Sequence, residues 1–165
     1  MPRPRALLQP VFCLALLAGC AGYDGRSLVP GQASAAEVEK VMGPAADKRT
    51  VAGETVLWYP RLPYGRVSYA ARIGKDDKLI AVEQRLTREN LQKLQPGVSR
   101  TSDARDVLGP PQRVDPYPRL EREVWTYQAQ DIDAQLIVVQ FSADGVLREA
   151  YMFNDPAFLP QQSAE

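Results

Sequence analysis

An internal repeat of about 66 residues is the feature that most constrains the fold of this 165-residue chain. Pro30-Gly31 recurs as Pro96-Gly97, and Gly43-Pro44 recurs as Gly109-Pro110, both at an offset of 66. The apolar residues between these pairs recur at the same offset: Val38, Val41 and Met42 match Ala104, Val107 and Leu108. A shared order of turn and apolar residues predicts two copies of one structural unit.

The offset grows slightly further along each copy. Trp58 matches Trp125 at an offset of 67, and the following matches lie at 68: Ile73, Asp76 and Leu79 against Phe141, Asp144 and Leu147. We therefore expect one extra residue in each of two loops of the second copy. The alignment places the two tryptophans at equivalent strand positions, where their large apolar area predicts a role in the core or between the units.

Each copy begins with a short helix pattern. Ser34 and Glu37 form a capping-box sequence, and Gly43-Pro44 ends the apolar stripe. In the second copy Ser99 is expected to cap a helix over residues 100–108, and Thr87 is expected to cap another over residues 88–95.

A strand-rich stretch follows each helix. Runs rich in Val, Ile, Trp, Tyr and Phe predict three strands per copy, at residues 54–59, 67–73 and 79–86 and at residues 122–128, 134–141 and 146–153. Each copy is thus expected to form an α+β unit, with one or two short helices packed on a three-stranded antiparallel sheet. Units of this size bury too little surface to be stable alone, so we expect the two to pack together.

The N-terminus has the pattern of a bacterial lipoprotein signal. Arg3 and Arg5 precede the short apolar run Val11–Ala18, and Leu17-Ala18-Gly19-Cys20 resembles a lipobox. The resemblance implies cleavage before Cys20 and acylation (palmitate) of its thiol, which leaves no free thiol because Cys13 departs with the signal. Ala21, in place of Asp, implies sorting to the periplasmic face of the outer membrane. The alternative is a secreted protein that is cleaved elsewhere.

These patterns divide the chain into five segments. We expect a signal peptide at residues 1–19, an N-terminal tether at 20–28, a first unit at 29–86, a second unit at 87–154 and a mobile tail at 155–165.

Composition excludes several classes of function. Twenty basic and 20 acidic side chains leave no net charge and no basic stripe, which argues against nucleic-acid binding. The chain has no histidine, the commonest general base and metal ligand. We therefore expect no catalytic residues, metal, cofactor or small-molecule substrate.

The second copy resembles the SmpA/OmlA family of outer-membrane lipoproteins, the BamE-like fold. The segments that carry the resemblance occur in the family's order: residues 86–94, Gly97–Arg100, Leu108–Pro111, Trp125–Tyr127 and Phe141–Gly145. The first copy matches more weakly across residues 29–84 and departs at Ile73, Asp77 and Ala45. The chain is thus identified as a tandem of two BamE-like units.

The resemblance implies a non-enzymatic lipoprotein that supports insertion of β-barrel proteins into the outer membrane. Its partners would be outer-membrane lipid, through acylated Cys20, and other proteins, among them components of the barrel-assembly machinery. Tandem helix-and-sheet units also occur in the β-lactamase inhibitory protein, so an inhibitor or sensor of a periplasmic enzyme is the alternative.

Two proline-stiffened loops are candidate partner-binding sites. Arg61 and Tyr64 lie in the first, and Tyr117 and Arg119 lie in the second. Tyr and Arg often anchor protein interfaces, and a stiff loop loses little entropy on docking. Plain surface loops are the alternative.

A third hypothesis is a carboxylate-based hydrolase. It would need two acidic side chains that converge in a cleft. The available carboxylates are Glu121, Glu123, Asp131 and Asp133, which fall in predicted turns or exposed strand positions.

Overall fold

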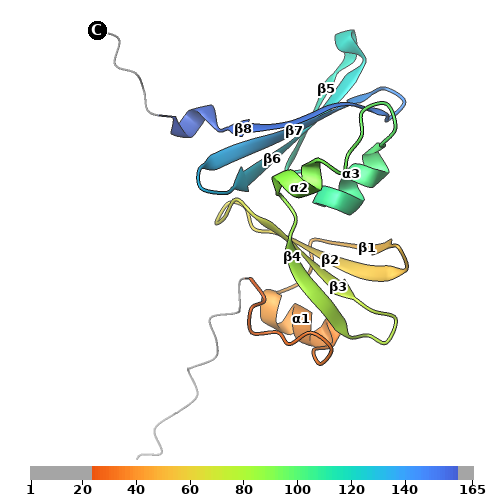
Figure 1. Cartoon of the computed structure of the whole chain (residues 1–165), viewed down its shortest axis with the longest axis vertical. Coiled ribbons are helices and arrows are strands. Elements are labelled where there is room, and N and C mark those ends of the chain that lie inside the picture. The colour runs from red at the N-terminus through yellow and green to blue at the C-terminus, as the bar shows by residue number, and fades with distance from the viewer. Residues whose placement is uncertain (1–23, 160–165) are drawn as a thin grey trace, which may run out of the picture.

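Two four-stranded antiparallel sheets and a few short helices make up this α+β protein (Figure 1). The computed structural model describes residues 24–159. The first sheet contains β1 (Asp47–Val51), β2 (Glu54–Pro60), β3 (Ser68–Ile73) and β4 (Leu79–Gln84), in that order. The second contains β5 (Arg113–Tyr117), β6 (Arg122–Gln130), β7 (Ala134–Ser142) and β8 (Leu147–Asn154).

The helices and sheets alternate as four layers. Helix α1 (Ala35–Met42) covers one face of the first sheet, and α2 (Arg88–Leu91) and α3 (Thr101–Leu108) lie between the two sheets (Figure 1). The first core joins α1 to the inner residues of its sheet, such as Leu57 and Ile73. The second core joins α2 and α3 to residues of the second sheet, such as Trp125 and Phe141.

Both copies of the repeat close with the same backbone hydrogen bonds. The Gly31 amide donates to the Leu79 carbonyl at 2.8 Å, and the Gly97 amide donates to the Leu147 carbonyl at 2.8 Å. Both sheets also carry a register shift at the same place, between Arg72 and Ile73 and, 68 residues later, between Gln140 and Phe141. The predicted repeat is therefore present in the backbone itself.

The prediction of three strands per sheet was wrong by one strand in each copy. The missed strands are β1 and β5, both at the edge of a sheet. Residues 47–51 (DKRTV) and 113–117 (RVDPY) carry several charges and a proline, because an edge strand is solvated and its outward amides need no partner. They therefore lack the apolar run on which a strand prediction depends.

Helix boundaries were only partly predicted. The Ser34–Glu37 capping box is present at α1. Helix α2 ends at Leu91 instead of residue 95. Ser99 does not cap α3, because its hydroxyl accepts a hydrogen bond from the Gln95 amide at 2.9 Å. The cap residue is Arg100, whose amide donates to the Asp103 carboxylate at 2.7 Å.

The two tryptophans are not at equivalent positions, which corrects the sequence alignment. Trp58 pairs with Ala70 and Trp125 pairs with Val139, and the two partners differ by 69 residues where the repeat requires 68. Both extra residues lie in one hairpin, since two residues separate β1 from β2 and four separate β5 from β6. A shift of one residue turns a side chain to the other face of a strand.

Trp58 consequently faces away from α1 and joins the two units. The equivalent of Trp58 is Thr126, and the equivalent of Trp125 is Leu57. Trp58 is fully buried together with Val56 and Ala70. Its ring lies against Gly109, the residue that ends α3: a Cβ on Gly109 would lie 2.4 Å from Trp58 Cε3.

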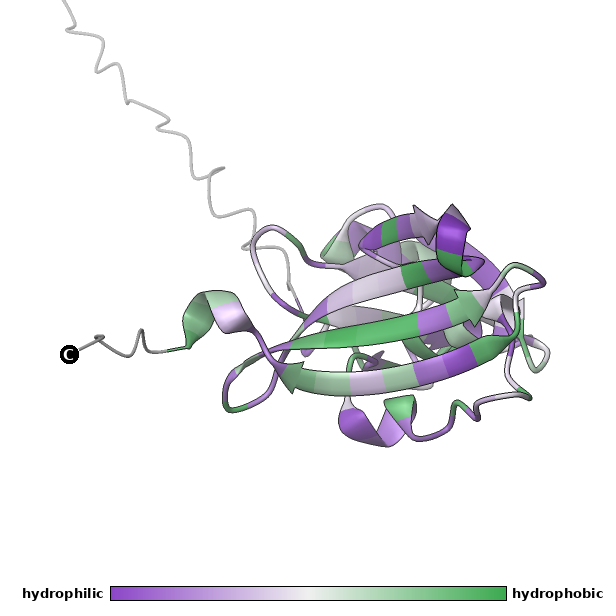
Figure 2. Ribbon diagram, turned by 90° about the horizontal axis from the view of Figure 1, so that it is seen from above, coloured by the Kyte–Doolittle hydropathy of each residue, from purple (hydrophilic) through white to green (hydrophobic). Residues whose placement is uncertain are grey.

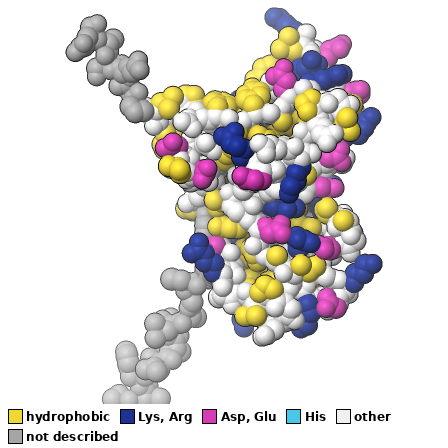
Figure 3. Space-filling view, viewed as in Figure 1, with side chains coloured by type: hydrophobic (Ala, Val, Ile, Leu, Met, Phe, Trp, Pro, Cys, Tyr) yellow, Lys and Arg dark blue, Asp and Glu magenta, His cyan; other side chains and the backbone are white. Residues whose placement is uncertain are grey.

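Charged side chains surround this contact. Arg49 Nε donates to Asp106 Oδ1 at 2.9 Å, and Arg105 lies 4.0 Å from Asp47. The Arg85 guanidinium lies over the Trp58 ring and donates to the Asp106 carbonyl at 3.3 Å. Basic and acidic groups alternate across the junction between the two sheets in Figure 3.

Arg66 holds the two units together at a second point. It extends from the β2–β3 loop and donates to the Ala129 and Gln135 carbonyls, at 3.0 and 2.7 Å. It also donates to Gln128 Oε1 at 3.0 Å and forms a 2.7 Å ion pair with Asp155. Four acceptors thus position this one guanidinium. Both side chains of the ion pair are largely buried, so the contact is shielded from water.

The chain folds onto the two units beyond the expected segment boundaries. Leu28, expected in the tether, packs against the first core. Leu86, expected to end the first unit, belongs to the core of the second. Asp155, expected to begin a mobile tail, is buried and precedes the short helix η2 (Pro156–Phe158). The first unit thus begins earlier than the repeat suggests, and the second unit extends further at both ends.

We predict that Gly109→Ala destabilises the protein much more than Gly43→Ala. Both glycines end a helix with φ near +88°, where an alanine costs about 1–3 kcal/mol. Only the alanine at 109 would also overlap the Trp58 ring, at a further cost of about 1–3 kcal/mol. Urea unfolding of both variants measures the difference. Equal losses would show that Gly109 has no packing role.

We predict that Arg66→Lys lowers the free energy of unfolding by about 2–4 kcal/mol, because one ammonium cannot serve four acceptors and the Asp155 carboxylate is largely buried. Arg26→Lys is the control, since the Arg26 side chain is 89 % exposed and an ion pair of this kind contributes little. Thermal unfolding with both variants checks this. A neutral Arg66→Lys would mean that the contacts around Trp58 hold the units together without this second point.

Candidate interaction surface

The outer face of the second sheet is the side turned away from α2 and α3. Alternation along the paired strands places three cross-strand rows on it. The rows are Arg113–Thr126–Val138–Tyr151, Asp115–Val124–Gln140–Glu149 and Gln128–Leu136–Phe153. We refer to these residues as the outer face.

The centre of the outer face is apolar and accessible. Tyr151 and Phe153 are 42 % and 37 % exposed, and their rings lie 5.8 Å apart. Val124, Leu136 and Val138 are half-buried beside them. Figure 2 looks onto this side, where no helix of residues 24–159 crosses the middle of the strands. A continuous apolar patch with polar groups at its rim is typical of a protein-binding surface.

The equivalent face of the first sheet is covered. There Trp58, buried together with Val56 and Ala70, lies against the end of α3. The counterparts of these three residues on the outer face are Val124, Thr126 and Val138. One unit thus buries this face against its neighbour, whereas the other leaves it accessible within the described chain. We conclude that the outer face is the free counterpart of an interface that the protein already uses.

The outer face has a charged rim on its β5 side. Arg113 Nε lies 2.7 Å from Asp115 Oδ2. The hydrogen bond with Asp115 raises the pKa of the Arg113 guanidinium above its usual value. The Arg113 side chain is 71 % exposed and the Asp115 side chain is 26 % exposed, so the pair is open to solvent mainly on its Arg113 side.

The four predicted loop residues do not form one site. Tyr117 follows Arg113 and Asp115 on the outward side of β5 and is 46 % exposed. Arg119 lies next to it in the short helix η1 (Pro118–Leu120), at the β5–β6 hairpin. These residues extend the outer face at one end.

Arg61 and Tyr64 belong to the β2–β3 loop in the other unit. Tyr64 is 90 % exposed, whereas Arg61 donates to the Met42 carbonyl at the end of α1. Arg66, two residues after Tyr64, contacts Ala129, at the far end of β6 from the β5–β6 hairpin. Tyr64 and Tyr117 are therefore separated by the length of the second sheet. The proposed lipidation site, Cys20, lies outside the described residues.

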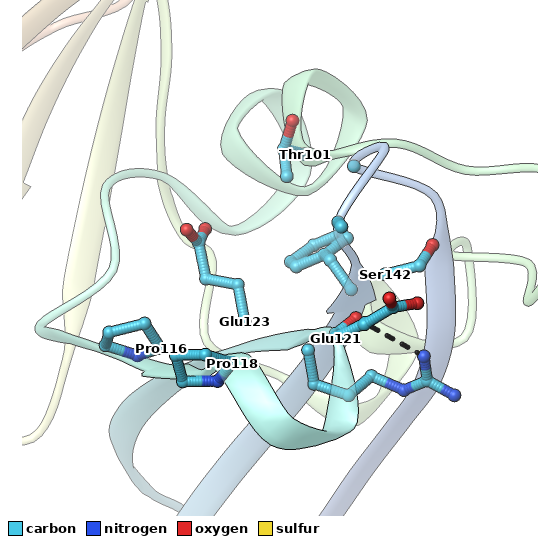
Figure 4. A pocket seen from close by; sticks show the side chains of 10 residues that line it. Thr101, Pro116, Pro118, Glu121, Glu123 and Ser142 are labelled. Carbon is cyan, nitrogen blue, oxygen red and sulfur yellow. Dashed lines mark hydrogen bonds between the residues drawn. The ribbon is translucent and has the colours of Figure 1, made fainter.

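An open cleft of about 480 Å³ lies between the β5–β6 hairpin and the start of α3 (Figure 4). Its carboxylates do not form a pair: Glu121 is exposed, and Glu123 accepts a 2.5 Å hydrogen bond from Trp125 Nε1. Asp131 and Asp133 lie in the β6–β7 turn at the other end of the strand. The four acidic residues of the hydrolase hypothesis thus do not converge in one cleft.

Residues 24–159 lack two features. No group of three or more Cys, Asp or Glu side chains there is arranged to hold a metal ion. No helix in this part of the chain has both the length and the apolar character needed to cross a membrane.

Comparison with known proteins returned little. No family model and no curated protein matches the chain. Among solved structures, a DUF4309 family protein, YjgB of Bacillus subtilis, is similar at 17 % sequence identity with a TM-score of 0.32. The match covers 79 % of this chain and 84 % of that one.

Proposed function

We propose that this chain is a lipid-anchored binding protein of the bacterial outer membrane, built from two BamE-like units, which supports β-barrel protein assembly or envelope integrity. The lipobox at Cys20 supports the anchor, and the ordered motifs of residues 86–145 support the family. Binding, and not catalysis, is favoured because the most developed exposed feature is a surface and not a cleft with paired catalytic groups.

The observation that carries the proposal is the outer face. A sheet that is covered in one unit and open in the other leaves an apolar, aromatic patch beside a charged rim. Tyr117 and Tyr151 place two aromatic rings there, and aromatic residues often dominate the binding energy of interfaces. The function that fits is docking of a protein, with the lipid holding the chain at the membrane.

We predict that Tyr151→Ser together with Phe153→Ser abolishes partner capture in cells but lowers stability by only about 1–2 kcal/mol, since cross-strand pairs contribute about 0.2–1 kcal/mol each. The control is Val98→Ser, which also replaces an apolar side chain by serine, at a residue that is 70 % exposed outside the outer face. Affinity purification after in-cell crosslinking is the measurement.

The identity of the captured protein separates the two binding hypotheses. Recovery of barrel-assembly components supports the scaffold role, and recovery of a soluble periplasmic enzyme supports the inhibitor or sensor role. Undiminished capture by the double variant would rule out the outer face as the binding surface and would favour the loop that contains Arg61 and Tyr64.

We predict that Cys20→Ser moves the protein from the outer-membrane fraction to the soluble periplasm, because the thiol is the only group that can take the lipid. Ala21→Asp is the matched control: it keeps the anchor and is expected to shift the protein to the inner membrane. Fractionation with marker proteins checks both. If Cys20→Ser stays with the outer membrane, the anchor is not at this residue.

A further inference from the structure

We propose that the outer face of one copy binds the α1 end of a second copy, so that molecules associate head to tail. The inference rests on the proposed function, because it names an occupant for the same face. The inference follows from the repeat. Inside the chain, the end of α3 packs on the first sheet. The α1 end is the equivalent of the α3 end, and the outer face is the equivalent of the covered face of the first sheet.

The template is the junction inside the chain. On the helix side it uses Arg105, Asp106 and Gly109 from the end of α3. On the sheet side it uses Asp47 and Arg49 of β1, with Trp58 of β2 between the strands and the helix. Two crossed ion pairs, Arg105 with Asp47 and Asp106 with Arg49, fix the helix on the sheet.

The same positions are free at the two ends of the molecule. At an offset of 66, Arg105, Asp106 and Gly109 correspond to Glu39, Lys40 and Gly43 of the first unit. Glu39 and Lys40 are exposed. A Cβ on Gly43 would meet nothing within 4 Å among residues 24–159, whereas one on Gly109 would meet Trp58. The α1 end therefore presents the shape of the α3 end, without an occupant in the described chain.

The sheet side has its counterpart on β5. Asp47 pairs with Trp58, and Arg113 pairs with Thr126, the equivalent of Trp58. Asp47 and Arg49 therefore correspond to Arg113 and Asp115 on the outer face. Where the internal junction has an acidic and then a basic residue, the outer face has a basic and then an acidic one.

The charges at both free ends are reversed together, so they remain complementary. The internal pair Arg105–Asp47 corresponds to Glu39 opposite Arg113 in the proposed contact. The internal pair Asp106–Arg49 corresponds to Lys40 opposite Asp115. Reversal at only one end would have placed like charges opposite each other. The reversal also disfavours binding of the α1 end to the already occupied first sheet, because it would bring Glu39 to Asp47 and Lys40 to Arg49.

Apolar contact is available in a shifted position. Thr126 replaces Trp58, but Tyr151 and Phe153 replace Glu83 and Arg85, so the aromatic area moves from β2 to the β8 side. On the α1 end the exposed residue Pro44, which directly follows Gly43, provides apolar surface. A contact of this type is heterologous: each copy uses two different surfaces, so a dimer keeps one of each free.

A crosslinking experiment tests the geometry. The chain from residue 20 onward carries Cys20→Ser and either Glu39→Cys or Arg113→Cys, and the two variants are mixed under mild oxidation. Disulfide-linked dimers are expected in the mixture and not from either variant alone, because the two positions meet only head to tail. Lys75→Cys, at an exposed turn, replaces Glu39→Cys in the control mixture. Dimers from Arg113→Cys alone, or an unlinked mixture, would overturn the proposal.

Charge reversal tests the ion pairs. Arg113→Glu is expected to weaken self-association in sedimentation velocity about tenfold, equivalent to about 1.4 kcal/mol, and Glu39→Arg in the same chain is expected to restore it. Unfolding midpoints of both variants provide the folding control, since the Arg113 side chain is 71 % exposed. Absence of self-association in the parent chain, or no rescue by the second change, contradicts the proposal.

Failure of this contact and failure of the proposed function give different results. If the purified chain remains monomeric while another protein is captured through Tyr151 in cells, the head-to-tail contact is refuted and the binding role stands. If the purified chain self-associates as described, but cell fractionation finds the protein away from the outer membrane, the contact stands and the proposed role fails.

Discussion

The arrangement of this protein depends on the contact between Trp58 and Gly109. The indole ring is fully buried against a residue that has no side chain, so the end of α3 approaches the first sheet more closely than any other residue would permit. A small α+β unit buries little surface and is marginally stable alone. Covering the second face of the first sheet buries more surface and makes the two units stabilise each other. The positive φ of Gly109 ends the helix at the same point, so one residue both terminates α3 and accommodates the indole.

Polar contacts fix the orientation of this packing. A flat apolar face alone would allow a helix to slide or rotate on it, whereas Arg49, Arg85 and Asp106 permit one alignment. Arg66 adds a second fixed point near the far end of β6, so the units are held at two separate places. Among the described residues Trp58 Nε1 has no hydrogen-bond acceptor, so the indole contributes to this contact through its shape and apolar area.

Much of the fold could be predicted from the sequence, because the repeat, the capping box at Ser34 and six strands depend on local patterns. Edge strands β1 and β5 could not, since solvation removes the apolar signal. The tryptophan alignment was wrong because sequence similarity placed one of the two extra residues too late, after Trp125 instead of before β6, and a strand reverses its faces with each residue. As a result, the outer face was not foreseen, although Tyr117 at its margin was selected for its residue type.

Duplication explains why such a face exists. A repeat whose interior copies bury both sides of each sheet must end in a copy with one side open, and repeat proteins usually make that terminal side polar. Here Val124, Val138 and Tyr151 keep it apolar, while the β5 rim carries charges in the opposite order to β1. Solubility alone would favour polar residues throughout this face. Retention of the apolar centre with an ordered charged rim is instead what selection for a specific occupant would produce.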